Sequence, residues 1–145
     1  MMIAVDTNLL VHAHQREASF HEKAKELIRN LAESPAPWAA CLHCFVEFYG
    51  VVTHPKLWKQ PSTPEEAIEQ IRAWRESPSL RILCDTSGVL DKLAEFAVNG
   101  AVRGALIHDA RIAACCLVGG VGELWTVDRD FSRFPALKTR NPLIT

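Results

Sequence analysis

Ile3-Ala4-Val5-Asp6, near the start of the chain, is a short apolar run that ends sharply at a carboxylate. Such a run is typical of a buried parallel strand, because helices cover both faces of the sheet in that setting. A second run, 124–127, ends in the same way at Asp128. The carboxyl ends of parallel strands gather at one edge of a sheet, where α/β proteins bind their ligands. The two stretches therefore predict a parallel sheet with acidic side chains at its functional edge.

Segments with helical periodicity alternate with the expected strands. The apolar positions of 20–31 follow a Ser19–Glu22 capping-box pattern, and those of 67–74 follow Thr63-Pro64. Further strands are expected at 38–41 and 80–84, and further helices through 90–96 and over 110–117. This alternation predicts one α/β domain over residues 1–145, with a central, mostly parallel sheet of four to five strands flanked by helices.

Composition narrows the class of protein. The chain has 145 residues, 48% hydrophobic and 23% charged, which is enough to bury a core. No apolar run approaches the roughly 20 residues of a membrane span, and the N-terminus lacks the basic region of a secretory signal. Five cysteines without such a signal favour reduced thiols, so we expect a cytoplasmic protein without membrane contact.

The charge pattern restricts how nucleic acid could be bound. The formal net charge is −1, so no overall positive field favours binding. Contact with a nucleic acid must then come from a local basic patch. One such stretch carries Arg129, Arg133, Lys138 and Arg140.

Four acids are the candidates for chemistry: Asp6, Glu47, Asp109 and Asp128. Two carboxylates about 4 Å apart repel by roughly 4 kcal/mol at an effective dielectric of 20. A cluster of them therefore favours either protonation or a bound cation. Oxygen donors without histidine or thiolate suit Mg²⁺ or Mn²⁺, which activate water for attack on a phosphodiester.

The residues alone leave a structural interpretation open for each acid. Asp6 and Asp109 also fit the N-caps of the helices that follow them. Glu47 lies in the apolar stretch 45–52, where an unpaired charge is costly to bury, yet it also fits the polar face of an amphipathic helix.

Five stretches resemble motifs of PIN-domain proteins, in the order that the family has them. They are Val5-Asp6-Thr7-Asn8-Leu9-Leu10, then 47–56 (EFYGVVTHPK), His108-Asp109-Ala110-Arg111-Ile112-Ala113-Ala114, 124–131 (LWTVDRDF), and the closing Phe134-Pro135 with Asn141-Pro142-Leu143. The second and the last are similar to one branch of the VapC toxins. The resemblance covers essentially the whole chain.

The resemblance implies a Mg²⁺- or Mn²⁺-dependent endoribonuclease that cuts RNA with metal-activated water. It implies the toxin half of a toxin–antitoxin pair, with a small VapB-like antitoxin as partner and a homodimeric assembly. Asp6, Glu47, Asp109 and Asp128 carry over as catalytic and metal-binding residues. The last motif offers two acids, and we expect Asp128 as the inner ligand with Asp130 outside it.

Supporting roles follow from the same motifs. Thr7, Asn8 and Thr126 are expected to orient the carboxylates. Arg111, Arg129 and Arg133 are candidates for contact with RNA.

Two other functions remain open. A non-catalytic RNA-binding module could use the same fold, and a divalent-dependent cleavage assay would separate the two. Cys41-Leu42-His43-Cys44 is a CxxC between an expected strand and helix, as in thiol–disulfide oxidoreductases, although two buried thiols also fit. The tryptophans at 38, 58, 74 and 125 are more typical of a core or an interface than of base stacking.

Overall fold

The computed structural model describes residues 1–144 and contains a five-stranded sheet in the order β3-β2-β1-β4-β5. Every neighbouring pair is parallel, so the expected four- to five-stranded parallel sheet is confirmed. The strands are β1 (Met2–Val5), β2 (Trp38–Cys41), β3 (Leu80–Leu83), β4 (Val121–Trp125) and β5 (Thr139–Arg140).

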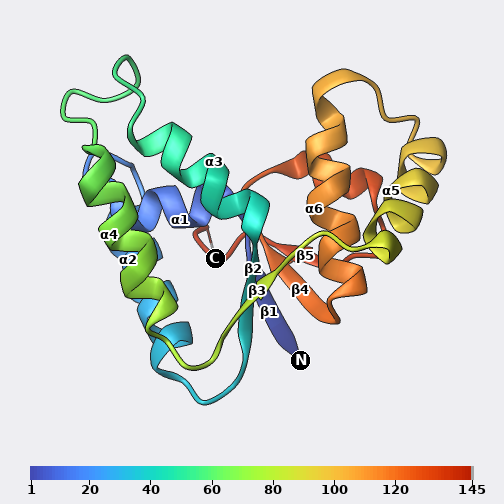
Figure 1. Ribbon diagram of the computed structural model, residues 1–145, viewed down its shortest axis with the longest axis horizontal. Coiled ribbons are helices and arrows are strands. Elements are labelled where there is room, and N and C mark those ends of the chain that lie inside the picture. The colour runs from blue at the N-terminus through green and yellow to red at the C-terminus, as the bar shows by residue number, and fades with distance from the viewer. Residues whose placement is uncertain (145) are drawn as a thin grey trace.

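Helices cover both faces of this sheet. Figure 1 shows α1 to α4 on one side and α5 with α6 on the other. Their bounds are α1 (Thr7–His14), α2 (His21–Glu33), α3 (Leu42–Val52), α4 (Pro64–Arg75), α5 (Ser87–Asn99) and α6 (Ile107–Val118), with 3₁₀ turns η1 (Gly104–Leu106) and η2 (Arg129–Arg133). Because it is covered on both faces, β2 is buried at all four positions. Within residues 1–144, no helix has the length and apolar run needed to cross a membrane.

Of the two predicted helix starts, one is confirmed and the other is wrong. Thr63 caps α4 as expected, since its Oγ1 accepts from the backbone N of Glu66 at 3.1 Å and the reciprocal bond is present. The Ser19 capping box is wrong, because α2 begins at His21 and its N-cap is Phe20, without a side-chain bond. The backbone N of Phe20 instead donates to Nδ1 of His12 at 3.4 Å, which ties this turn to α1.

Two boundaries near the acids also differ from the sequence prediction. The last helix begins at Ile107, directly after η1, so Asp109 lies inside its first turn and does not cap it. β4 ends at Trp125, so two residues separate the strand from Asp128. Asp128 instead caps η2 by accepting from the backbone N of Asp130.

Candidate active site

The structure brings the four predicted acids to one cavity of about 310 Å³ at the carboxyl edge of the sheet. Asp6 follows β1, Glu47 lies on α3, Asp109 on α6, and Asp128 on the loop after β4. Thr7 and Asn8, at the start of α1, line the same cavity. Four segments that are distant in sequence thus converge on one place, while the catalytic roles of these residues stay a prediction.

Asp6 is both a helix cap and a member of the cluster. One carboxylate oxygen accepts from the backbone N of Thr7 at 2.7 Å, and the other accepts from Thr126 Oγ1 at 2.7 Å and from Asn8 Nδ2 at 3.3 Å. The residue is only 4% exposed. Burial raises the pKa of Asp6, the bonds from Thr126 and Thr7 oppose that rise, and the carboxylates of Glu47 and Asp128 add to it.

The residues expected to orient the acids lie between them. Thr126 Oγ1 accepts from the backbone N of Asp128 at 3.0 Å while it donates to Asp6. Asn8 Oδ1 accepts from the backbone N of Val127 at 3.3 Å. Thr7 Oγ1 donates to Glu47 Oε1 at 3.5 Å. These bonds tie α1 to α3 and to the loop that carries Asp128.

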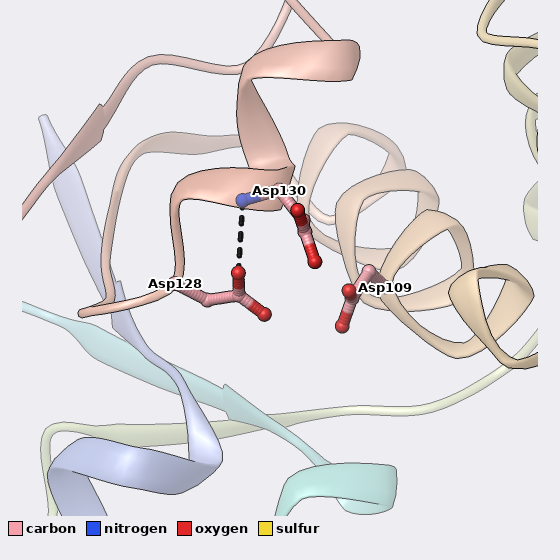
Figure 2. Close-up of side chains that lie close together, drawn as sticks. All are labelled: Asp109, Asp128 and Asp130. Carbon is pink, nitrogen blue, oxygen red and sulfur yellow. Dashed lines mark hydrogen bonds between the residues drawn. The ribbon is translucent and has the colours of Figure 1, made fainter.

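Asp109, Asp128 and Asp130 form the tightest group of acids. Each offers an oxygen, and these atoms all lie within 4.8 Å of one another. Figure 2 shows the three carboxylates, from α6 and from the start of η2, pointing toward a common space. Burial first, and then the neighbouring carboxylates with Asp128 foremost, together raise the pKa of Asp109 to about 6. Three crowded carboxylates with no imidazole or thiolate among them are a donor set for a hard divalent cation.

The two acids of the last motif are placed differently. Asp128 lines the cavity together with Asp6 and Glu47, whereas Asp130 is exposed on η2. Both reach Asp109. This placement is in keeping with Asp128 as the inner ligand, an assignment that stays a prediction.

A chain of polar contacts that the sequence analysis did not anticipate supports Glu47. His43 Nε2 lies 2.7 Å from Glu47 Oε1, an electrostatic contact that lacks the direction of a hydrogen bond. His43 Nδ1 is 3.2 Å from Arg111 Nη1, and the guanidinium of Arg111 is paired with Asp85. His43 could have been found from its i,i+4 spacing to Glu47, whereas nothing in the sequence links Asp85 to this site. Arg111 is thus engaged by protein partners, and its contact with RNA stays a prediction.

Most of the basic stretch is also occupied by protein partners. Arg133 donates to the backbone O of Gly100 at 3.1 Å. Lys138 pairs at 3.4 Å with Glu123, and Arg140 lies over the ring of Trp125. Arg129 is exposed, and no side-chain partner for it is found within the described part of the chain. Of the three predicted RNA contacts, Arg129 is therefore the freest, and it adjoins Asp128 and Asp130.

The CxxC pair does not have the setting of a redox site. Cys41 is 3% exposed and Cys44 is fully buried. Contact with Cys115 raises the pKa of the Cys41 thiol, and contact with Cys41 raises that of Cys44, together with burial. Thiol–disulfide enzymes need an accessible thiolate of low pKa. Cys44 instead lies beneath the acids, with its Sγ 3.8 Å from Asp6 Oδ1.

Comparison with known proteins gives consistent matches. The PIN domain family model matches residues 3–137. Ribonuclease VapC48 of Mycobacterium tuberculosis is 32% identical over 137 residues, which cover 94% of each chain. Ribonuclease VapC43 of the same organism is 29% identical, over 98% of this chain and 96% of that one. These matches confirm the resemblance found in the motifs.

Solved structures agree on the fold. VapBC2 from Rickettsia felis, bound to a DNA fragment from its promoter, superposes with a TM-score of 0.69 over 97% of this chain and 98% of that one, at 18% identity. Mycobacterium tuberculosis VapC20, described as a Sarcin-Ricin loop cleaving toxin, has a TM-score of 0.67 over 90% of this chain and 92% of that one, at 22% identity.

Proposed function

The chain belongs to the PIN-domain family, and from that premise we propose that it is a divalent-metal-dependent endoribonuclease, the toxin of a toxin–antitoxin pair. One observation carries the proposal: Asp6, Glu47, Asp109 and Asp128 line a single cavity. The names of the relatives support the choice of RNA as substrate, since proteins matched over nearly their whole length are called ribonucleases.

The donor set fits a hard cation. Asp109, Asp128 and Asp130 would hold it, with Mg²⁺ or Mn²⁺ preferred for all-oxygen ligands. The carboxylate of Asp109 accepts no hydrogen bond from any residue between 1 and 144. Burial raises its pKa most, and the neighbouring carboxylates, whose charge a cation would neutralise, raise it as well. When bound, such an ion lowers the pKa of its water and offsets charge on the phosphate under attack.

The protein residues divide the remaining work. The oxygens of Asp6 accept from Thr7, Asn8 and Thr126. Besides the metal-ligand role predicted for it, we therefore assign Asp6 to holding the edge of the cavity and the Asp128 loop in place. The side chain of Glu47 is 42% exposed at the cavity. We assign it the proton of the attacking water, at a carboxylate oxygen kept in position by Thr7 and His43.

A cleavage assay with matched variants tests the proposal. We expect purified protein to cut single-stranded and structured RNA in Mn²⁺ or Mg²⁺, to stop in EDTA, and to leave 5′-phosphate ends. Asp109→Asn should abolish cutting, whereas Asp91→Asn, an exposed acid on α5, should not. The alternative, a non-catalytic RNA-binding module, predicts RNA binding without any divalent-dependent cleavage.

Partners and setting complete the proposal. The VapBC complexes among the structural neighbours support a small VapB-like antitoxin as partner. We further propose a homodimer, testable by light scattering, and one PIN domain over residues 1–145, in line with the family match to 3–137. Four cysteines buried as thiols are in keeping with the reducing cytoplasm, which we propose as its location.

A further inference from the structure

The cavity that holds the acids has a second wall of different chemistry. This wall consists of Val11, His12, Val51, Trp58 and Ile112. A metal site for phosphate chemistry needs only the acids, so an apolar and aromatic surface facing them requires a separate explanation. A cavity of about 310 Å³ is at the small end of ligand pockets, roughly 300–1,000 Å³. It offers room for one nucleotide unit and not for several.

Trp58 is held in this wall by its polar edge. Its Nε1 donates to the backbone O of Val51 at 2.9 Å, while the side chain is only partly buried. No aromatic ring between residues 1 and 144 pairs with that of Trp58, whereas Trp74 packs against Phe45 and Phe48. An indole with its N–H satisfied and part of its surface exposed beside a polar cavity is a surface on which a base can stack.

The loop that carries Trp58 is anchored directly after it. The carboxylate of Glu17 accepts from the backbone N of Lys59 at 3.0 Å and of Gln60 at 2.9 Å. Farther along the loop, His14 Nε2 lies 2.8 Å from Ser62 Oγ. Trp58 therefore reaches the cavity from a fixed backbone, which lowers the entropy cost of using it as a binding surface.

His12 presents a donor on the same wall. Its Nδ1 accepts from the backbone N of Phe20, so the proton of the neutral ring resides on Nε2. Burial lowers the pKa of His12, which keeps the ring neutral near pH 7. Nε2 has no protein partner in the described part of the chain, leaving this donor available to a ligand.

We propose that this second wall binds the nucleobase next to the scissile phosphate, with Trp58 stacking on the base and His12 donating to an acceptor on the nucleotide. The inference rests on the proposed function, because the adjoining acids define where the phosphate lies. Unpaired bases are what sequence-reading RNA proteins bind on aromatic side chains. Trp58 and His12 are thus binding residues for the substrate, while the acids act on the phosphodiester.

Single nucleotides test the wall without requiring cleavage. Each of AMP, GMP, CMP and UMP is titrated with Mn²⁺ present and compared with ribose 5-phosphate, which has the same phosphate and sugar but no base. We expect at least one nucleotide to bind roughly tenfold more tightly than ribose 5-phosphate to the parent and to Trp58→Phe. Trp58→Ala should lose that difference and His12→Ala should reduce it, while binding of ribose 5-phosphate stays the same.

The matched control is Leu57→Ala, which shortens an exposed neighbour on the same loop that does not line the cavity. It should behave as the parent does. If Trp58→Ala does not fold, the comparison of nucleotides with ribose 5-phosphate in the parent still decides. Quenching of Trp58 fluorescence, taken as parent minus Trp58→Phe, gives a second measure.

Two results would overturn the inference. One is equal binding of ribose 5-phosphate and all four nucleotides by the parent. The other is a folded Trp58→Ala that still binds a nucleotide more tightly than ribose 5-phosphate. This holds also if the substitution weakens the complex with the antitoxin. If the protein cleaves RNA but binds nucleotides no more tightly than ribose 5-phosphate, the base-binding role of the wall is rejected and the endoribonuclease is not. Base discrimination without any cleavage would support the wall and reject the endoribonuclease.

Discussion

Replacing Asp109 by Asn tests whether burial and the crowding of the acids together destabilise the metal-free protein. Asp109 suits the test because no residue between 1 and 144 donates a hydrogen bond to its carboxylate. The amide keeps nearly the same shape and removes one charge. The α6 cap is not affected, since the N-cap is Leu106.

The magnitude follows from the pKa of Asp109, raised from 3.8 to about 6. A difference of that size corresponds to at most about 3 kcal/mol of unfolding free energy. The side chain is partly exposed, so solvent screening reduces the usable amount to about 1 kcal/mol. We therefore expect metal-free Asp109→Asn to be more stable than the parent by about 1 kcal/mol at pH 7.5, or roughly 4 °C in Tm.

The pH dependence has a definite sign. Between pH 3.8 and about 6 the folded parent binds more protons at Asp109 than the unfolded chain does. Its stability therefore falls as the pH rises through that window. The advantage of Asp109→Asn should be close to zero at pH 4, grow through pH 6 and be complete above pH 7. A divalent cation should reverse the order, because at 100 times Kd a ligand stabilises the parent by about 2.7 kcal/mol.

The assay is a set of melting curves for both proteins at pH 4.5, 6 and 7.5, in EDTA and in millimolar Mn²⁺. Asp91→Asn serves as the control for removing a surface charge. A variant no more stable than the parent at pH 7.5 in EDTA would refute the crowded cluster. So would a stability difference that does not change with pH.

Further variants test the parts of the site separately. His43→Ala should lower kcat at least tenfold with little change in KM, because Glu47 loses a contact of 2.7 Å. His43→Gln should restore part of the rate. Equal kcat for the parent and both variants would contradict a positioning role of His43 for Glu47. Arg129→Ala should reduce the salt slope of RNA binding by about 1, measured by anisotropy from 50 to 200 mM salt, whereas Arg133→Ala should leave it unchanged because Arg133 is bound to Gly100. Cys44→Ser should keep activity and Cys44→Ala should weaken Mn²⁺ binding, since only serine retains a donor toward Asp6. If calorimetry gives the parent and Cys44→Ala the same Mn²⁺ affinity, the thiol only fills space.

The sequence was sufficient where local and tertiary preferences agree. β2 was predicted at its observed bounds, because a fully covered strand is continuously apolar. Thr63 was recognised as a cap because its two bonds are local. The Ser19 cap failed because a tertiary contact, from Phe20 to His12, fixes that turn. Local pattern cannot reveal a competing partner eight residues away.

The acids of the site could be predicted from the sequence, whereas the residues that surround them could not. The acids follow strands or stand in recognisable motifs, so their convergence followed from the parallel topology. The Asp85–Arg111–His43 contacts connect three segments and leave no spacing pattern in the chain. Trp58 was expected in the core or an interface, since side-chain type alone does not say which surface faces a cavity.

Asp6 and Asp109 belong to the same acidic cluster, yet replacement by Asn should affect the stability of the protein differently at the two positions. Because Asp6 belongs to the acidic cluster, its replacement by Asn would be expected to stabilise the metal-free protein, as we expect for Asp109→Asn. Yet the carboxylate of Asp6 only accepts hydrogen bonds. Its donors are Thr7, Asn8, Thr126 and Cys44. An amide would turn its own N–H₂ toward one of these donors, and a buried unsatisfied group costs about 1–3 kcal/mol. That cost equals or exceeds the relief of repulsion, so Asp6→Asn should gain no stability even though its charge is the more deeply buried.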